Sequence, residues 1–421
     1  LLSQPLRGEV RKMATMGWFG GSGGAALLLA LCLLFFCSGG AAASAEVPDR
    51  PGIPDPLTLG GGERVTTPGA WSAKRRPELL ELFRTHVYGR TPVRRPDKLT
   101  FTTSVTPGMM DGAATRKRVR VDYEGPGGKG GFDMTLFVPA NAKKPVPVFL
   151  LLCNRPAVVN IDPDRKTKSP FWPAEEIVAR GYAAAAFYLS EVDPDKHDGF
   201  KDGAHGIFDP LRDGGKRAGD SWGTIAAWAW GASRAMDYFE TDADLDAKRV
   251  AVVGHSRGGK TALWAGAEDE RFALVVSNDS GSTGAAISRG KKGETVAQIN
   301  KAFPHWFAEN YRAFDGREAA LPVDQHELLA LIAPRLLYVA SASEDTWADP
   351  ESEFLACVLA EPVYRLFGKE GVGAKSLPKP ESPLHAGHIG HHVRTGKHDL
   401  AVYDWAQFMD FADRHGWSKP E

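Results

Sequence analysis

The chain has 421 residues, 43% of them hydrophobic, and its 51 lysines and arginines nearly balance 52 aspartates and glutamates. This length and hydrophobic content suffice for a large buried core, either in a single domain or divided among several. A protein that binds nucleic acid needs a basic face, and the formal net charge of −1 gives no indication of one. Nucleic acid is therefore not expected as a partner. A local exception is the basic stretch TRKRVR at residues 115–120, whose alternation with valines predicts a solvated strand face.

The first 45 residues are predicted to be a secretory signal peptide preceded by a few upstream residues. An apolar run from Ala25 to Cys37 follows Arg11 and Lys12 and leads into small residues that end at Ala45. This run is shorter than the roughly 20 residues that a membrane-spanning helix needs, and the small residues are typical of a cleavage site. We expect a secreted protein, periplasmic or extracellular, without membrane contact after cleavage; a retained membrane anchor is the alternative.

Two cysteines, Cys153 and Cys357, remain after removal of this segment. Both lie among apolar residues, which predicts buried free thiols and no disulfide. The cysteines show no C-x-x-C spacing and therefore indicate no zinc site.

The following segment, residues 46–70, is rich in proline and glycine and is predicted to be an extended lead-in. Next, Leu79, Leu82 and Phe83 recur at helical spacing, and Pro77 suits the first turn of a helix. Alternating residues then predict three antiparallel strands separated by glycine and proline turns, at 99–106, 117–123 and 132–138.

The rest of the chain alternates between strands and helices. The uninterrupted apolar run at 146–153 is typical of a strand that is covered on both faces. Helices are predicted at 173–180 and 221–239, and further strands at 182–189, 249–253, 272–277, 335–341 and 388–394. Such alternation implies a mostly parallel sheet with helices on both faces, here in one catalytic domain from residue 71 to 421. Residues 281–333 exceed what a crossover needs and are predicted to form a cap or one wall of a cleft.

A tight turn between the strand at 249–253 and the next helix carries Ser256. The residues Gly254-His255-Ser256-Arg257-Gly258 match G-x-S-x-G in the strand-turn-helix context that this motif requires. The turn would lift the hydroxyl above the sheet and direct the next backbone N–H toward a developing oxyanion. Ser256 is therefore the predicted nucleophile; the alternative is a glycine turn whose serine caps the helix.

A serine nucleophile needs a histidine base, and four histidines lie near the last predicted strand. His388, His391 and His392 lie in or just before that strand, whereas His398 follows it on a loop at the carboxyl edge of the sheet. Ligands of open α/β sheets bind at that edge. We predict His398 as the base, with His392 as the second choice. The cluster places no carboxylate at ligand spacing on a shared helix face, so no metal is expected.

Two aspartates are candidates for the acid that orients the histidine. Asp279 and Asp345 each follow a predicted strand, and both could reach the base. Asp345 follows the penultimate strand, which is the usual position, and is preferred; Asp279 is the alternative, and Glu344 a weaker one. Loop capping would be the purely structural role of either aspartate.

With these residues in place, the sequence resembles the glucuronoyl esterases, carbohydrate esterase family 15. The segment GHSRGGK matches the bacterial family motif G-x-S-R-x-G-K, and HVYGRTP, SNDSGSTGAA, GETVAQINKAFPHWF, EDTWADP and HVRTGKHDL are similar to other signatures of the family. The resemblance extends over roughly residues 70 to 417. Fungal members typically carry a glutamate at the earlier acid position, where this chain has an aspartate.

This resemblance implies an α/β-hydrolase fold and a role for each matching residue. Ser256 would be the nucleophile, His398 the general base, and Arg257 a group that stabilises the oxyanion. Lys260, Glu294 and Trp347 would hold the hydroxyl groups of the sugar, with Gln298 as a weaker candidate. An arginine and a lysine in the first turn of a helix oppose the helix dipole, which independently favours a functional role for Arg257 and Lys260.

The resulting expectation is a secreted, cofactor-free serine esterase that cleaves esters of 4-O-methyl-glucuronic acid, as in cross-links between xylan and lignin. The protein is expected to be a monomer whose partner is its polysaccharide substrate. An acetyl-xylan or cinnamoyl esterase on the same fold is the second interpretation. A carbohydrate-binding protein that has lost catalysis is the third.

Overall fold

The protein is described from a computed structural model in which residues 50, 52–143, 145–210 and 215–417 are placed. The predicted signal peptide lies outside these residues. The described residues belong to one compact unit, Ser44–Glu421. None of the helices in the described part has both the length and the apolar character needed to span a bilayer.

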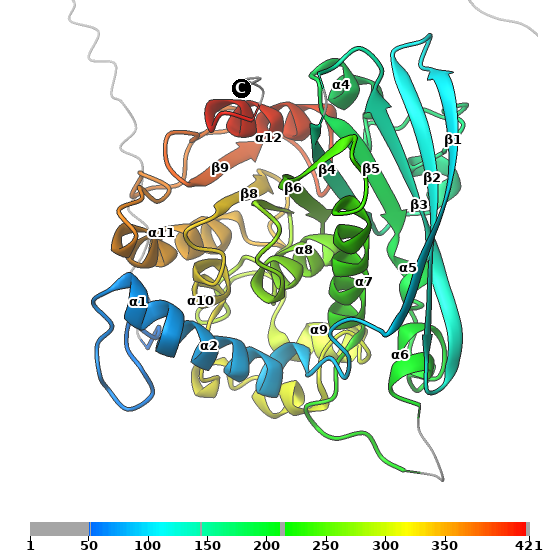
Figure 1. The fold of residues 1–421 in the computed structure, drawn as a ribbon. Helices are drawn as coiled ribbons and strands as arrows, with labels where there is room; N and C mark the ends of the chain where they lie inside the picture. Colours follow the sequence, from blue (N-terminus) through cyan, green and yellow to red (C-terminus); the bar gives the residue numbers. More distant parts are fainter. Residues whose placement is uncertain (1–49, 51, 144, 211–214, 418–421) are drawn as a thin grey trace, which may run out of the picture. The chain divides into compact units, whose positions relative to one another are not determined.

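The described residues form a nine-stranded sheet in the order β1-β2-β3-β5-β4-β6-β7-β8-β9 (Figure 1). Its strands are β1 (Lys98–Met109), β2 (Ala114–Gly125), β3 (Gly128–Pro139), β4 (Val146–Cys153), β5 (Ala183–Tyr188), β6 (Leu245–His255), β7 (Leu274–Asn278), β8 (Leu336–Ala342) and β9 (Ile389–Arg394). The first three strands are antiparallel, β3 joins β5 antiparallel, and all later neighbours are parallel. The predicted mixed sheet is therefore confirmed.

Helices cover both faces of the parallel part of the sheet (Figure 1). Their bounds are α1 (Pro68–Ala70), α2 (Arg76–Phe83), α3 (Ala157–Asn160), α4 (Ala174–Ala179), α5 (Leu189–Val192), α6 (Gly203–Phe208), α7 (Thr224–Phe239), α8 (Arg257–Glu268), α9 (Val296–Ala302), α10 (Gln325–Ala330), α11 (Pro350–Leu366) and α12 (Val402–Arg414). Two π-helical turns, η1 (Trp71–Arg75) and η2 (Arg84–Tyr88), flank α2, and two 3₁₀ turns, η3 (Glu309–Phe314) and η4 (Glu318–Ala320), precede α10.

The core is divided into two layers by the period-2 alternation of the strands. On β4, Leu150 and Leu152 pack with the residues of α7, α8, α10 and α11. Phe149 and Leu151 point to the opposite face and pack with the residues of α4 and α12. All residues of β4 are buried, as the uninterrupted apolar run predicted, because both faces of this strand are covered.

The basic stretch on β2 is less solvated than the sequence predicted. Arg118 is exposed, but Lys117 is buried and its Nζ lies 2.6 Å from Oδ1 of Asp242. Lys117 shares the inward face of β2 with Val119 and Val121, and the aspartate neutralises its charge there. The expectation of a uniformly solvated face was wrong at this residue.

The carboxyl ends of β6, β7, β8 and β9 are neighbours at one edge of the sheet because these strands are parallel and consecutive. The loops that leave this edge carry Ser256, Asp279, Asp345 and His398. Residues 281–333 contain α9, η3, η4 and α10. Cys153 and Cys357 are buried free thiols, as predicted.

Candidate active site

Ser256 occupies a strained backbone position between β6 and α8. Its φ of 57° and ψ of −124° place a non-glycine residue in a region that side chains disfavour. Its backbone N–H donates to the Asn278 carbonyl at 2.9 Å, and its side chain makes no capping hydrogen bond to α8. The purely structural alternative, a serine that caps the helix, is therefore wrong.

The glycines of the motif allow this turn to close. A Cβ atom on Gly254 would lie 1.9 Å from the backbone oxygen of Gly258, and one on Gly258 would lie 2.8 Å from the Leu152 oxygen. Both distances are too short for a side chain, so strand, turn and helix can approach each other only with glycine at these positions.

His398 pairs with Asp345. Its Nδ1 atom lies 2.6 Å from Oδ2 of Asp345, whose side chain is 6% exposed against 43% for the histidine. The other carboxylate oxygen of Asp345 accepts a hydrogen bond from the Ala348 N–H at 3.2 Å. A carboxylate at Nδ1 fixes the tautomer and leaves Nε2 for proton transfer.

The second histidine candidate, His392, is fully engaged inside the protein. Its Nε2 lies 2.8 Å from Oδ1 of Asp404, and its Nδ1 lies 3.0 Å from the Tyr338 hydroxyl. Because both ring nitrogens have partners and the ring is buried, His392 has no nitrogen to offer a substrate.

Asp279 lies beside this pair in a more buried position. Its Oδ2 atom accepts a hydrogen bond from the Asp399 N–H at 3.4 Å, and Arg394 Nη2 is 3.9 Å away. Burial, reinforced by the charges of Glu353 and Asp345, raises the pKa of Asp279 well above its usual range. Burial thus favours the neutral form of the Asp279 carboxyl group, whereas Asp345 has the histidine as its partner.

The ligand atoms of Asp279, Asp345 and His398 lie within 4.8 Å of one another, which is a spacing that a metal ion could use. A metal would, however, need the ionised form of Asp279, and it would have to displace the Asp345 carboxylate from Nδ1 of His398. The three groups fit an acid–histidine pair with a second, buried carboxyl group beside it better than they fit a metal centre.

Arg257 follows Ser256 directly and is held by groups outside its own helix. Its Nε lies 2.7 Å from Oδ2 of Asp195, and its Nη2 donates to the Asn154 carbonyl at 3.2 Å. The carboxylate of Asp195 compensates the unfavourable position of a cation at the start of α8.

Lys260 is buried in the first turn of the same helix. Its Nζ donates to the Ser280 carbonyl. Burial, opposed in part by the charge of Glu294, lowers the pKa of Lys260 to about 8. A buried amine with this pKa can change its charge near neutral pH.

Trp347 and Glu294 are joined by a hydrogen bond between their backbones. Trp347 is 55% exposed, unusual for a tryptophan, and its carbonyl accepts from the Glu294 N–H at 3.0 Å and from Lys291 Nζ at 3.1 Å. Gly293 permits this approach, since a Cβ there would lie 2.1 Å from the Trp347 oxygen. The backbone of Trp347 is thus fixed to residues 281–333, and its indole is exposed.

Gln298 has a local structural role. Its Oε1 accepts from the Thr295 N–H at 2.8 Å, and the Thr295 hydroxyl accepts in turn from the Gln298 N–H at 3.3 Å, a capping box for α9. This arrangement engages the oxygen that a sugar hydroxyl would otherwise use.

The sequence did not reveal the polar groups that contact the site residues or their loops. These are Asp195, which contacts Arg257, Lys291, which contacts Trp347, and the buried Glu353, which contacts Gly281. Each acts through a contact with a distant loop, and no local pattern marks it. Asp195 could have been suspected only from the need of Arg257 for a counter-charge.

Comparisons with known proteins identify the family of this chain. A family model described as glucuronyl esterase of fungi matches residues 126–368. A carbohydrate esterase from an unknown prokaryotic organism is 42% identical over 392 residues, covering 86% of this chain and 89% of that protein. A 4-O-methyl-glucuronoyl methylesterase from Schizophyllum commune is 29% identical over 331 residues, covering 75% and 74%.

Among solved structures, a glucuronoyl esterase from Solibacter usitatus aligns with a TM-score of 0.80 at 42% identity. The alignment covers 88% of this chain and 99% of that one. The fold shared with this esterase, the tight turn at Ser256 between β6 and α8 (the elbow) and the identity over nearly the whole length lead to one conclusion: the chain belongs to the glucuronoyl esterase family.

Proposed function

We propose that this protein is a serine esterase that hydrolyses esters of 4-O-methyl-glucuronic acid in glucuronoxylan, releasing the alcohols of lignin. The observation that carries the proposal is the strained turn at Ser256 together with the His398–Asp345 pair, in a chain of the glucuronoyl esterase family. The ring of His398 lies 4.4 Å from that of His255, the residue before Ser256. The 42% identity to a carbohydrate esterase supports the class of reaction.

In the proposed mechanism, Nε2 of His398 removes the proton of the Ser256 hydroxyl as Oγ attacks the ester carbonyl carbon. The tetrahedral intermediate places a negative charge on the former carbonyl oxygen, and the Arg257 N–H and guanidinium stabilise it. His398 then gives its proton to the leaving alcohol as the C–O bond breaks. Water, activated by the same histidine, attacks the acyl-enzyme, and the uronic acid departs as Ser256 regains its proton.

The sugar is recognised by residues of α8 and of the loops that follow β7 and β8. Lys260 and Glu294 offer a charged donor and a charged acceptor for hydroxyl groups, and the exposed face of Trp347 suits the apolar side of a sugar ring. Gln298 is retained as a weaker contact because its oxygen already caps α9.

Export is part of the proposal, since a polymer such as xylan is met outside the cell. The apolar run at residues 25–37 supports cleavage near Ala45. Amino-terminal sequencing of the protein recovered from the periplasm or medium tests this. A mature start near residue 46 is expected, and an uncleaved membrane-bound form would contradict it.

The activity is tested with benzyl glucuronate and an acetyl ester, each with the wild-type protein and Ser256→Ala. We expect strong hydrolysis of the glucuronate ester, lost in the variant. Preference for the acetyl ester would keep the mechanism and replace the substrate, as an acetyl-xylan esterase. Activity that survives Ser256→Ala would overturn the mechanism, and binding to xylan without turnover would indicate a carbohydrate-binding protein.

A further inference from the structure

Asp195 connects Arg257 to residues far from the elbow. It lies between α5 and α6, and its side chain is 21% exposed. One carboxylate oxygen, Oδ2, lies 2.7 Å from Nε of Arg257. The other, Oδ1, accepts hydrogen bonds from Nε2 of His305 at 3.0 Å and from Nε1 of Trp306 at 2.8 Å. Each carboxylate oxygen of Asp195 thus has its own partners, and these contacts fix the side chain at both oxygens.

The same contacts restrict the guanidinium of Arg257. Its Nη2 donates to the Asn154 carbonyl at 3.2 Å, and its central carbon lies 5.8 Å from the centre of the Trp306 ring. Nε and Nη2 are therefore occupied, whereas Nη1 has no hydrogen-bond partner among the described residues. An arginine side chain loses rotamer entropy when it is ordered, so fixing it before the reaction removes that cost from the transition state.

Asp195 carries its negative charge permanently at neutral pH. Burial by itself would raise its pKa, but hydrogen bonds from His305 and Trp306 and the charge of Arg257 hold the pKa below its usual range. The counter-charge of Arg257 is therefore not lost under the conditions in which an esterase works.

We propose that Asp195, supported by His305 and Trp306, is a positioning residue for the oxyanion: it holds Arg257 in place and acts on the reaction only through that arginine. The inference rests on the proposed function and deepens it. It also gives residues 281–333 a role in catalysis, because His305 and Trp306 belong to that segment.

A double-mutant cycle tests the proposal. Asp195→Asn keeps the shape of the side chain and removes its charge; it is compared in the wild-type and in the Arg257→Ala backgrounds. In the wild-type background we expect kcat to fall by about tenfold or more, with KM changed by less than about twofold. In the Arg257→Ala background the same change is expected to alter kcat by less than about twofold, because the group that Asp195 positions is gone.

Asp246→Asn is the matched control. Oδ2 of Asp246 lies 2.7 Å from Nε of Arg249 at the other end of β6, with side-chain exposures of 18% and 28%, close to those of the Asp195–Arg257 pair. This control is expected to leave kcat unchanged. Should Asp195→Asn unfold, Trp306→Phe is the second variant: it removes the Nε1–H donor and leaves a smaller aromatic ring in its place. It is expected to give a smaller fall in kcat that is likewise absent in the Arg257→Ala background.

The cycle is run on both the glucuronate ester and the acetyl ester, since an oxyanion forms in either reaction. If the glucuronate ester is not hydrolysed but the coupling is present with the acetyl ester, the substrate proposal fails and the role of Asp195 stands. Equal losses in both backgrounds, or a loss confined to KM, would overturn the role of Asp195 as a positioning residue.

Discussion

His398 and Asp345 form a short contact, with Nδ1 of the ring 2.6 Å from Oδ2 of the carboxylate, across loops that follow adjacent parallel strands. Asp279 lies close by at the end of β7, but its Oδ2 accepts from the Asp399 backbone, and burial raises the pKa of its carboxyl group well above the usual range. Two aspartates at one site thus have different partners, because only Asp345 contacts the imidazole of His398. This separates the acid that orients His398 from the one beside it.

The two aspartates are therefore expected to respond differently to replacement by asparagine. Asp345→Asn presents an amide to Nδ1 and favours the wrong tautomer of His398, so kcat should fall by about 10³- to 10⁴-fold. Asp279→Asn leaves the contact between His398 and Asp345 in place and should cost less than about tenfold. Steady-state kinetics on benzyl glucuronate measure both, and thermal unfolding controls for folding. A larger loss in Asp279→Asn would exchange their roles.

The pKa of about 8 for Lys260 predicts an alkaline limb in the pH profile. Burial stabilises the neutral amine, so Lys260 is charged below this pKa and loses its charge as the pH rises through it. We expect KM for the glucuronate ester to rise above pH 8 by about 10- to 100-fold, since a hydrogen bond from a charged group is lost, with kcat affected less.

Lys260→Met removes the titrating group and serves to identify it. The variant should show a raised KM already at pH 7 and no further rise near pH 8. The acetyl ester, which has no sugar hydroxyls, is the internal control and should show no such limb in either protein. An alkaline rise in KM that persists in Lys260→Met would assign it to another group.

The exposed indole of Trp347 predicts a binding effect without a stability effect. Because the side chain is 55% exposed, Trp347→Ala removes little buried area from the folded protein. Loss of the contact with the sugar ring should raise KM by roughly tenfold, in line with about 1.5 kcal/mol for an aromatic contact. Trp347→Phe should recover part of the affinity. A fall in melting temperature by several degrees in Trp347→Ala would show instead that the residue supports the fold.

Most of the framework of the site follows from local patterns. The all-apolar run of β4 required cover on both faces, and the glycines around Ser256 required a tight turn, because a Cβ on Gly254 has no room. His398 was separable from His392 by its position after the strand. These features depend on residues close in sequence, which is why the sequence predicts them.

Long-range contacts were not predictable in the same way. Both Asp279 and Asp345 follow strands that end at the same edge of the sheet as Ser256, and only the side-chain directions decide which one contacts His398. Asp195 comes from a loop with several aspartates, and nothing in its neighbours indicates that it pairs with Arg257. Lys117 is a second example. The basic pattern around it predicts a solvent-exposed side chain, whereas Lys117 is buried because the distant Asp242 neutralises its charge.

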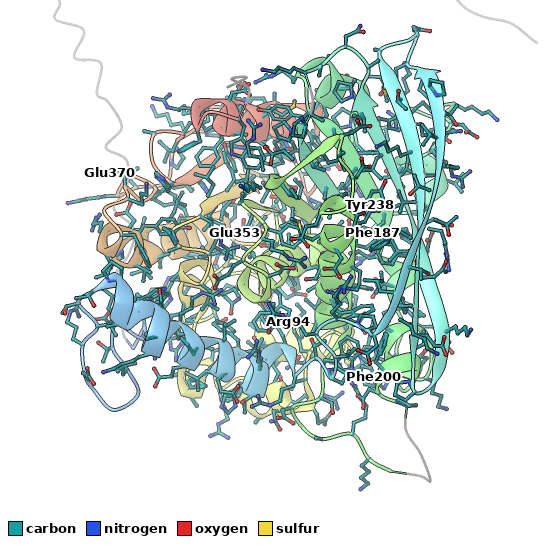
Figure 2. The ribbon with its side chains drawn as sticks, in the orientation of Figure 1. Arg94, Phe187, Phe200, Tyr238, Glu353 and Glu370 are labelled. Atoms are coloured by element: carbon teal, nitrogen blue, oxygen red, sulfur yellow. The ribbon has the colours of Figure 1, made fainter. Side chains whose placement is uncertain are left out.

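Glu353 on α11 predicts how stability depends on pH. It is completely buried in the interior (Figure 2), where it accepts hydrogen bonds from Ser341 Oγ at 2.6 Å and the Gly281 N–H at 2.8 Å. Burial outweighs these bonds and raises the pKa of Glu353 to about 7, from an ordinary value of about 4.3. With the folded pKa raised, the stabilisation by protonated Glu353 is complete below about pH 4.3 and is lost as the pH rises through 7.

Glu353→Gln should make the loss of unfolding free energy between pH 5 and 8 smaller by up to about 3 kcal/mol, since the amide does not titrate. Its carbonyl can accept from Gly281 and its NH₂ can donate to Ser341, so the packing is retained. Glu327, whose pKa burial also raises to about 7, keeps its own contribution, and the slope of unfolding free energy against pH should become shallower without vanishing.

Urea unfolding at four pH values measures this slope. Glu351→Gln, on the exposed side of α11, controls for removal of a carboxylate. An unchanged slope in Glu353→Gln would mean that Glu353 is already ionised throughout this range, and that its hydrogen bonds outweigh its burial.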